Sequence, residues 1–283
     1  MTTVSVRYDP NATYEIESQD VEYRRDGATS WLARVTRPKG AGPFPALLDV
    51  HGGAWANGDR LMNDGTDQAL AASGLVIVAI DFRTSLNAPS PAAMEDINYG
   101  IRWLKAHAAE FGASPEQVGG VGWSSGGHQI MLAGMRPRQY ATLPLAEAPS
   151  LDASLAYVIM GWPVIDPLAR HKLAEGRGNK ELMENHLRYF GSEAGMIAES
   201  PPHIARSGQS IETPPALLVQ GAADEALTRM MAEDFVEAYS LAGGIIELAK
   251  YPGEPHGFLR QPGPNSARAL AMIKSFIARH LAG

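Results

Sequence analysis

The sequence predicts an α/β fold, with a mostly parallel central sheet, helices on both faces and a small cap insertion. Short apolar runs rich in β-branched residues alternate along the chain with longer segments of helical period. Several of these runs end directly in glycine-rich loops, as buried strands do at the edge of a sheet. We expect residues 1–283 to form a single domain, because no repeat or low-complexity tract divides a chain of this length.

The strands are expected in short runs bounded by proline, glycine or turn residues. The first two runs are separated by the turn signal DGATS, and the run GLVIVAIDF is apolar enough to be buried on both faces. The expected strands are 21–25, 31–38, 44–50, 74–82, 117–123, 156–162, 215–221 and 245–251.

Helices are expected between the later strands. Residues 91–111 carry apolar side chains three and four positions apart, which gives a helix one apolar face. Residues 125–135 follow a strand and predict a helix, and residues 225–242 have helical period. Residues 265–283 are amphipathic and are expected to end a helix at Gly283.

One long segment, residues 163–213, interrupts the alternation of strands and helices. It has no strand pattern, although KELMENHLRYF (180–190) within it is helical in period. A structureless loop of this length is unusual between two sheet strands. We therefore expect a cap or lid at 163–213, without a separate domain.

Composition limits the classes of partner. The net charge of −7 and the pI near 5.6 argue against nucleic acid, whose phosphates require a basic face. The chain has no cysteine, so disulfides and thiolate metal sites are excluded. The N-terminus lacks the basic and apolar regions of a secretory signal, and no apolar run is long enough to span a bilayer. We expect a soluble, cytoplasmic protein without membrane partners, and a homodimer is an open alternative.

The stretch VGWSSGGHQ, residues 121–129, holds a candidate nucleophile at the end of a strand. A sharp strand-to-helix turn requires small residues two before and two after its central serine, which is the reason for the pattern G-x-S-x-G. Ser124 has Gly122 and Gly126 at these positions, whereas Ser125 has Trp123 on one side. A dinucleotide-binding loop is disfavoured, because GVGWSS lacks the third glycine and the acidic residue about 20 positions on. Ser124 is therefore the predicted nucleophile.

A serine nucleophile needs a base and an acid that orients the base. His256 lies in a proline- and glycine-rich loop after the last expected strand, where the base belongs in this chain order. Asp224 follows the strand at 215–221 and is the preferred acid, and Asp166 is the alternative. The histidines within 163–213, His171, His186 and His203, are expected to be solvated.

The sequence HGGAW, residues 51–55, predicts an oxyanion hole. Glycines let the backbone approach a substrate closely, so the N–H of Gly53, with that of Gly52 or Ala54, is a candidate donor together with the N–H of Ser125 at the helix start. His51 is expected to hold the loop in shape. The tryptophans Trp55, Trp123 and Trp162 are candidate substrate-binding residues, and Trp55 is equally compatible with the core.

These motifs resemble the α/β-hydrolase superfamily, and within it the hormone-sensitive-lipase-like esterases. HGGAW with NGDR, AIDFR, GWSSGGH, QGAADE and EPHGF match that pattern between about residues 44 and 260. The resemblance implies a carboxylesterase with Ser124, Asp224 and His256 as its triad. It also implies a cap formed by residues 163–213 and the N-terminal arm. Ala54 departs from the usual third glycine of the oxyanion loop.

The shape H-G-G-x-W, with His128 closing G-x-S-x-G-x-H, is also similar to the arylformamidases. His128 itself is expected to be structural. The predicted function is ester hydrolysis of a small acyl or aryl substrate through an acyl-enzyme, with no metal or cofactor. Amide or formamide hydrolysis is the first alternative, and a non-catalytic ligand-binding protein on the same fold is the second.

Overall fold

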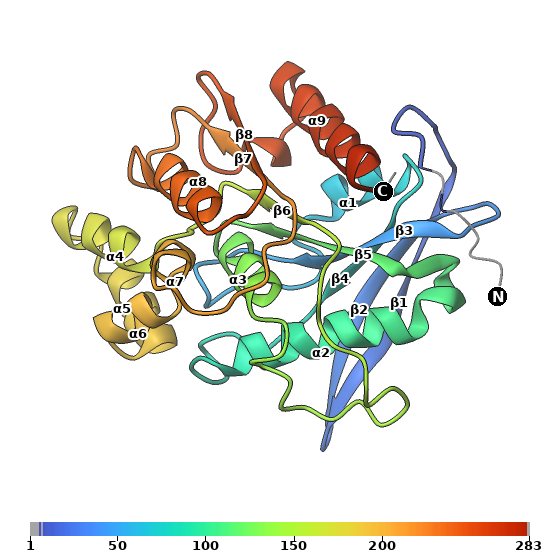
Figure 1. Cartoon of the computed structure of the whole chain (residues 1–283), viewed down its shortest axis with the longest axis horizontal. Coiled ribbons are helices and arrows are strands. Elements are labelled where there is room, and N and C mark those ends of the chain that lie inside the picture. Colours follow the sequence, from blue (N-terminus) through green and yellow to red (C-terminus); the bar gives the residue numbers. More distant parts are fainter. Residues whose placement is uncertain (1–5, 7, 282–283) are drawn as a thin grey trace.

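A computed structural model describes residues 6 and 8–281, and within them eight strands form one mixed sheet (Figure 1). The strand order is β1-β2-β4-β3-β5-β6-β7-β8. Neighbouring strands from β4 through β3, β5, β6 and β7 to β8 pair in parallel. At the other edge, β2 pairs antiparallel with both β4 and β1. The strands are β1 (Ile16–Asp26), β2 (Thr29–Pro38), β3 (Phe44–Val50), β4 (Val76–Ile80), β5 (Ala113–Trp123), β6 (Val158–Gly161), β7 (Ala216–Gly221) and β8 (Ile246–Tyr251).

Helices cover both faces of this sheet, as predicted. The helices are α1 (Asp64–Ala71), α2 (Ala92–His107), α3 (Ser125–Met135), α4 (Pro167–Gly176), α5 (Lys180–Phe190), α6 (Glu193–Ala198), α7 (Pro201–Arg206), α8 (Met231–Leu241) and α9 (Pro264–Leu281). One apolar core joins the sheet to α2, α3 and α8, and a second joins its other face to α1 and α9 (Figure 1). The chain has a three-layer α/β architecture.

The central strands have the composition that burial on both faces requires. Every residue of β3, β4, β6 and β7 is buried, and these strands are nearly continuous runs of apolar side chains. Parallel pairing places their carboxyl ends at one edge of the sheet. The loops after β3, β5 and β7, and the loop after β8, therefore meet there.

Element bounds differ from the sequence predictions in physically simple ways. Helix α1 was not predicted, because it has only eight residues and includes Gly65. The helix expected at 91–111 ends at His107, and its last turn, Ala108–Phe111, is a 3₁₀ helix. Helix α8 begins at Met231, because the residues before it form the loop after β7. The expected helix end at Gly283 lies outside the described residues.

Residues 163–213 hold four helices, α4 to α7, between β6 and β7. Helices α4, α5 and α6 gather at one end of the molecule, on the left of Figure 1. The sequence predicted α5 with its bounds but not the other three.

The described part of the N-terminal arm lies elsewhere. Tyr14 packs edge-on against Phe44, with ring centroids 5.4 Å apart, and the Tyr8 hydroxyl contacts Ser73 Oγ at 2.9 Å. This arm packs beside the start of β3 and the end of α1, away from α4 to α6 (Figure 1). The expectation that it forms part of a cap is wrong for residues 6 and 8–15, and residues 1–5 and 7 lie outside the described part.

Candidate active site

The turn between β5 and α3 gives Ser124 an unusual backbone. Its φ of 56° and ψ of −117° lie in a region that costs a non-glycine residue about 1–3 kcal/mol. A Cβ at Gly122 would fall under 3.0 Å from the carbonyl oxygen of Gly126, and a Cβ at Gly126 would meet the carbonyl oxygens of Val50 and His51 as closely. Both glycines are therefore needed for the turn, as the G-x-S-x-G spacing predicted.

Three side chains from three different loops meet at this turn. His256 Nε2 lies 2.9 Å from Ser124 Oγ, and His256 Nδ1 lies 2.8 Å from Asp224 Oδ2. The imidazole thus bridges the hydroxyl and the carboxylate. In this arrangement Nε2 can accept the hydroxyl proton while Nδ1–H donates to the carboxylate, which is the geometry that general-base activation of a serine requires.

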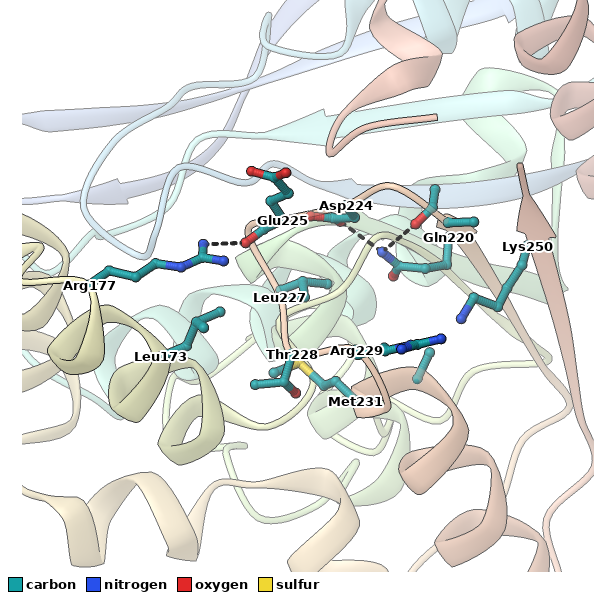
Figure 2. A pocket seen from close by; sticks show the side chains of 13 residues that line it. Leu173, Arg177, Gln220, Asp224, Glu225, Leu227, Thr228, Arg229, Met231 and Lys250 are labelled. Atoms are coloured by element: carbon teal, nitrogen blue, oxygen red, sulfur yellow. Dashed lines mark hydrogen bonds between the residues drawn. The ribbon is translucent and has the colours of Figure 1, made fainter. Parts of the chain in front are cut away.

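The carboxylate of Asp224 is held from three directions. Its side chain is only 2% exposed. The backbone N–H of Ala226 donates to Oδ1 at 2.8 Å, and Gln220 Nε2 donates to Oδ2 at 2.7 Å. Figure 2 shows Gln220 directed at Asp224 from the end of β7. The sequence analysis did not predict a role for Gln220. Its position at the carboxyl end of the strand before Asp224 is the feature that could have indicated one.

The alternative acid, Asp166, has a different role. It is the N-cap of α4, where Oδ1 accepts a hydrogen bond from the Ala169 N–H at 3.1 Å. Its other oxygen lies 4.0 Å from Nδ1 of His203. Asp166 makes no described contact with His256, so the structure brings Asp224 and not Asp166 to the imidazole.

The loop after β3 lies beside Ser124. Its conformation is held by His51 Nδ1, 2.8 Å from the Gly52 carbonyl oxygen, and by the Trp55 N–H, which donates to Ser125 Oγ at 3.2 Å. Gly53 has a φ of 107°, a region that favours glycine. A Cβ at Gly52 would lie 2.8 Å from the carbonyl oxygen of Trp123, so only glycine permits this approach.

Free backbone donors face the same region. Among the described backbone hydrogen bonds outside helices and strands, none is donated by the N–H of Gly52, Gly53, Ala54 or Ser125. Ser125 is the first residue of α3, so its N–H has no partner within the helix. These groups can donate to an oxyanion that forms at a carbonyl attacked by Ser124.

A pocket of about 380 Å³ opens over Ser124 and His256. The segment 163–213 contributes nearly half of its lining, which the sequence analysis did not foresee residue by residue. The lining residues are Gly53, Ala54, Asn57, Met62, Ser124, Arg170, Asn179, Glu181, Leu182, Asn185, His256 and Arg260. A larger hollow of about 570 Å³ lies beyond Asp224 and includes neither Ser124 nor His256 (Figure 2).

The three tryptophans do not line this pocket, so their predicted substrate-binding role is corrected. Trp55, Trp123 and Trp162 are 2%, 1% and 1% exposed. Trp123 Nε1 donates to Asp49 Oδ1 at 2.7 Å. Trp162 packs edge-on against His256, with ring centroids 6.2 Å apart, and so supports the imidazole from behind. Large indoles are buried here because the interior offers them apolar contacts.

Trp55 lies under the segment 163–213, among buried histidines. Its ring packs against His186 at 4.9 Å between centroids, and its Nε1 donates to His128 Nδ1 at 3.3 Å. His128 Nε2 therefore carries the proton and donates to the Glu199 carbonyl oxygen at 2.7 Å. Burial lowers the pKa of His128 and of His186 to about 4. His128 is a buried structural side chain, as expected.

Two histidines of the segment 163–213 correct the sequence prediction. His186 and His171 are 0% and 4% exposed, whereas solvated positions were expected. Their rings pack against each other, with centroids 5.5 Å apart.

A buried pair of carboxyl groups, Asp49 and Asp67, lies near the turn that carries Ser124. Asp49 at the end of β3 accepts hydrogen bonds from Trp123 Nε1 and from Asn63 Nδ2, the second at 3.0 Å. Burial raises the pKa of Asp67 well above its usual range, because a second carboxylate cannot be solvated there. The folded pair therefore binds a proton more tightly than two exposed carboxylates would.

Neither a metal cluster nor a membrane helix is found within the described chain. Residues 6 and 8–281 contain no group of three or more His, Asp or Glu side chains that could hold a metal ion. Over the same residues, no helix is long and apolar enough to cross a membrane.

The fold and the site agree with the family to which the sequence is related. The BD-FAE family model matches residues 35–239. The chain belongs to the BD-FAE family. Carboxylic ester hydrolase LipN of Mycobacterium tuberculosis is 29% identical over 262 residues, covering 88% of this chain and 67% of LipN. Esterase LipC of the same organism is 27% identical over 254 residues, covering 84% of this chain but only 59% of LipC.

Solved structures of esterases share this fold. Thermogutta terrifontis esterase 2 phosphonylated by sarin has a TM-score of 0.77 and 25% identity, covering 93% of this chain and 94% of that chain. The propionate-bound form of the same esterase has a TM-score of 0.73 and 25% identity, with 94% of each chain covered. The predicted relation to the α/β-hydrolase carboxylesterases is confirmed by these matches together with the family model.

Proposed function

We propose that this chain is a serine carboxylesterase that hydrolyses esters of small acyl groups. The observation that carries the proposal is the hydrogen-bonded series from Ser124 through His256 to Asp224, with distances of 2.9 and 2.8 Å. Ser124 and His256 of this series line a pocket, next to backbone N–H groups with no described partner. Propionate and butyrate are bound in structures of Thermogutta terrifontis esterase 2, which supports a small acyl group here.

The reaction proceeds in two acyl transfers. His256 Nε2 removes the proton from Ser124 Oγ as the oxygen attacks the ester carbonyl carbon. Asp224 fixes the tautomer with hydrogen on Nδ1 and stabilises the imidazolium that forms. The N–H groups of Gly53 and Ser125 donate to the oxyanion, with Gly52 permitting the close approach of the loop.

His256 then protonates the leaving alcohol, and the acyl group remains on Ser124. Water attacks this acyl-enzyme with His256 again as base, and the acid is released. These steps need no group beyond the side chains and backbone donors named here.

We propose further that residues 163–213 act as a cap within a single domain. Their contribution to the pocket lining supports this role. The cytoplasmic location remains a prediction from the sequence, and a homodimer remains an open alternative to a monomer.

Nothing in the described lining of the pocket favours amide or formamide hydrolysis over ester hydrolysis. The features that suggested it, Trp55 and His128, are buried and hydrogen-bonded to each other. They hold the interior together and do not touch the pocket over Ser124, so they do not select between an ester and an amide.

The experiment is hydrolysis of 4-nitrophenyl acetate, butyrate and octanoate beside an aryl formamide. We expect the short esters to be cleaved and Ser124→Ala to abolish turnover. Ser125→Ala is the control for the choice between the two adjacent serines. It removes only the hydroxyl that accepts a hydrogen bond from the Trp55 N–H and should reduce kcat by less than about tenfold. Formamide turnover well above the esters would move the assignment to amide hydrolysis, and absence of all turnover would favour the binding-protein reading.

A further inference from the structure

The pocket over Ser124 carries positive charge in an otherwise acidic chain. Two guanidinium groups line it, Arg170 from α4 and Arg260 from the 3₁₀ helix Phe258–Arg260. Glu181 is the one carboxylate that lines the same pocket among the described residues. The whole chain has a net charge of −7, so this concentration of cationic groups runs against the average.

Arg170 is a largely buried cation that forms no ion pair within the described chain. Its Nε donates to the carbonyl oxygen of Ala226, in the loop that carries Asp224. Its Nη1 is buried and has no hydrogen-bond partner, and no carboxylate of residues 6 and 8–281 lies within 4.0 Å of the guanidinium. Burial lowers the pKa of Arg170 to about 10, so the group is charged at neutral pH. The Asp224 carboxylate acts on Arg170 only from beyond ion-pair distance. Burying a charge is costly, and a bound anion would offset part of that cost.

Arg260 lines the same pocket from a different element. It follows His256 by four residues, and the φ of 79° at Gly257 starts the tight turn between them. Arg260 is exposed and makes no described ion pair or side-chain hydrogen bond within the described chain. Several other arginines of the described chain form ion pairs: Arg34, for example, contacts Asp20 at 2.7 Å.

Glu181 does not neutralise these two groups. It stands in the first turn of α5, is exposed, and makes no described ion pair with either arginine. An exposed charge is screened by water and salt, whereas a largely buried one is screened much less. The cationic character of Arg170 is therefore available to a ligand inside the pocket.

We propose that the substrate of this esterase carries a free carboxylate, which Arg170 and Arg260 bind while Ser124 attacks the ester carbonyl. This inference rests on the proposed function and deepens it by naming the substrate class. A guanidinium matches a carboxylate with two parallel N–H donors, which neither an ammonium nor an amide can offer. The carboxylate belongs either to the acyl group, as in a half-ester of a dicarboxylic acid, or to the alcohol, as in an ester of a hydroxy acid.

Matched pairs of substrates test the inference. On the acyl side, the mono-4-nitrophenyl esters of glutarate and adipate are compared with the corresponding terminal carboxamides, with uncatalysed hydrolysis subtracted. On the alcohol side, 4-carboxyphenyl butyrate is compared with 4-carbamoylphenyl butyrate. Each pair differs in charge and hardly in size. We expect kcat/KM to favour the carboxylate by roughly 10–100-fold in one of the two arms, the effect of a hydrogen bond to a charged group.

Three variants locate that preference. Arg260→Gln loses no contact within the described chain and should reduce the ratio about tenfold, through KM. Arg170→Gln should reduce it as much, and its rate on the neutral carboxamide reports any disturbance of the Asp224 loop through Ala226. The matched control is Arg229→Gln, an exposed arginine of the hollow beyond Asp224, which removes the same net charge and should leave the ratio unchanged (Figure 2).

The outcomes separate this inference from the proposed function. If neutral esters are cleaved but both carboxylate ratios stay near one, the inference is refuted and the esterase stands. A preference that survives both Arg170→Gln and Arg260→Gln, or that Arg229→Gln removes equally, refutes the two-arginine site. If no ester of any charge is hydrolysed, the proposed function fails and this inference fails with it.

Discussion

A methyl group at Gly126 should disrupt the turn that carries Ser124. The added Cβ would lie under 3.0 Å from two backbone carbonyl oxygens, those of Val50 and His51. Both atoms belong to β3 or to the loop that follows it, so neither can swing aside as a side chain can. Overpacking of this kind costs about 3 kcal/mol at the upper end of its usual range. Alanine gains about 1 kcal/mol over glycine in a helix, which leaves a net loss of about 2 kcal/mol.

Gly65→Ala is the matched control for Gly126→Ala. Gly65 lies in α1 with helical backbone, and a Cβ there meets nothing within 4 Å. The same substitution should therefore stabilise the protein by about 0.5–1 kcal/mol. Urea unfolding followed by tryptophan fluorescence measures both changes, and the two variants should move in opposite directions.

Activity gives a second measure of the Gly126→Ala variant. Because the clash pushes the loop of Gly53 away from α3, kcat for a short ester should fall about 10²–10³-fold, the effect of losing one oxyanion donor. A Gly126→Ala protein that is as stable as wild type and keeps its full kcat would refute the close packing of α3 against β3.

Four other substitutions test the site and its support. Asp224→Asn should lower kcat about 10⁴-fold, because an amide favours the wrong imidazole tautomer. Asp166→Asn should leave kcat within about twofold, since asparagine also caps a helix; only a loss of about 10⁴-fold, as expected for the triad acid, with Asp224→Asn still active, would make Asp166 the acid. Gln220→Leu removes one donor from the Asp224 carboxylate and should lower kcat about tenfold with little change in KM; an unchanged kcat would contradict the positioning role. Burial raises the pKa of Asp67 in the folded state above 3.8, the ordinary value for an aspartate in the unfolded chain. The folded state therefore keeps a proton that the unfolded chain releases, and the free energy of unfolding of wild type falls as the pH rises above 3.8. Asp67→Asn should flatten this fall between about pH 4 and pH 7 in urea unfolding, and an equal slope in both proteins would contradict the buried pair.

Local patterns predicted the parts of the fold that depend on local physics. The register of the Ser124 turn follows from steric limits two residues away on either side, and those limits are visible in the sequence. Helix α5 was predicted with its bounds, because its apolar side chains recur at helical spacing. Strand β3 was likewise predicted with its bounds as an apolar run between a proline and a glycine.

Features that depend on tertiary packing could not be predicted in this way. Asp166 and Asp224 both follow a sheet strand, and only the position of His256 in space separates them. Trp55 was compatible with pocket and core alike, because the sequence does not show that α5 covers it.

The charge of the pocket is a further property of packing. Arg170 sits in an ordinary helical segment, and nothing in its neighbours along the chain indicates that it lines the space over Ser124. The number of charges in a sequence gives the net charge, but the fold decides which of them face a substrate.

The most direct test of the central claim is labelling with paraoxon, followed by intact mass and peptide mapping. We predict that wild type gains one diethylphosphoryl group, that esterase activity is lost in step, and that the modified residue is Ser124. Ser124→Ala should gain none, although Ser125 remains beside it. Modification of Ser125, or equal labelling of the Ser124→Ala protein, would contradict the assignment of the nucleophile and with it the proposed mechanism.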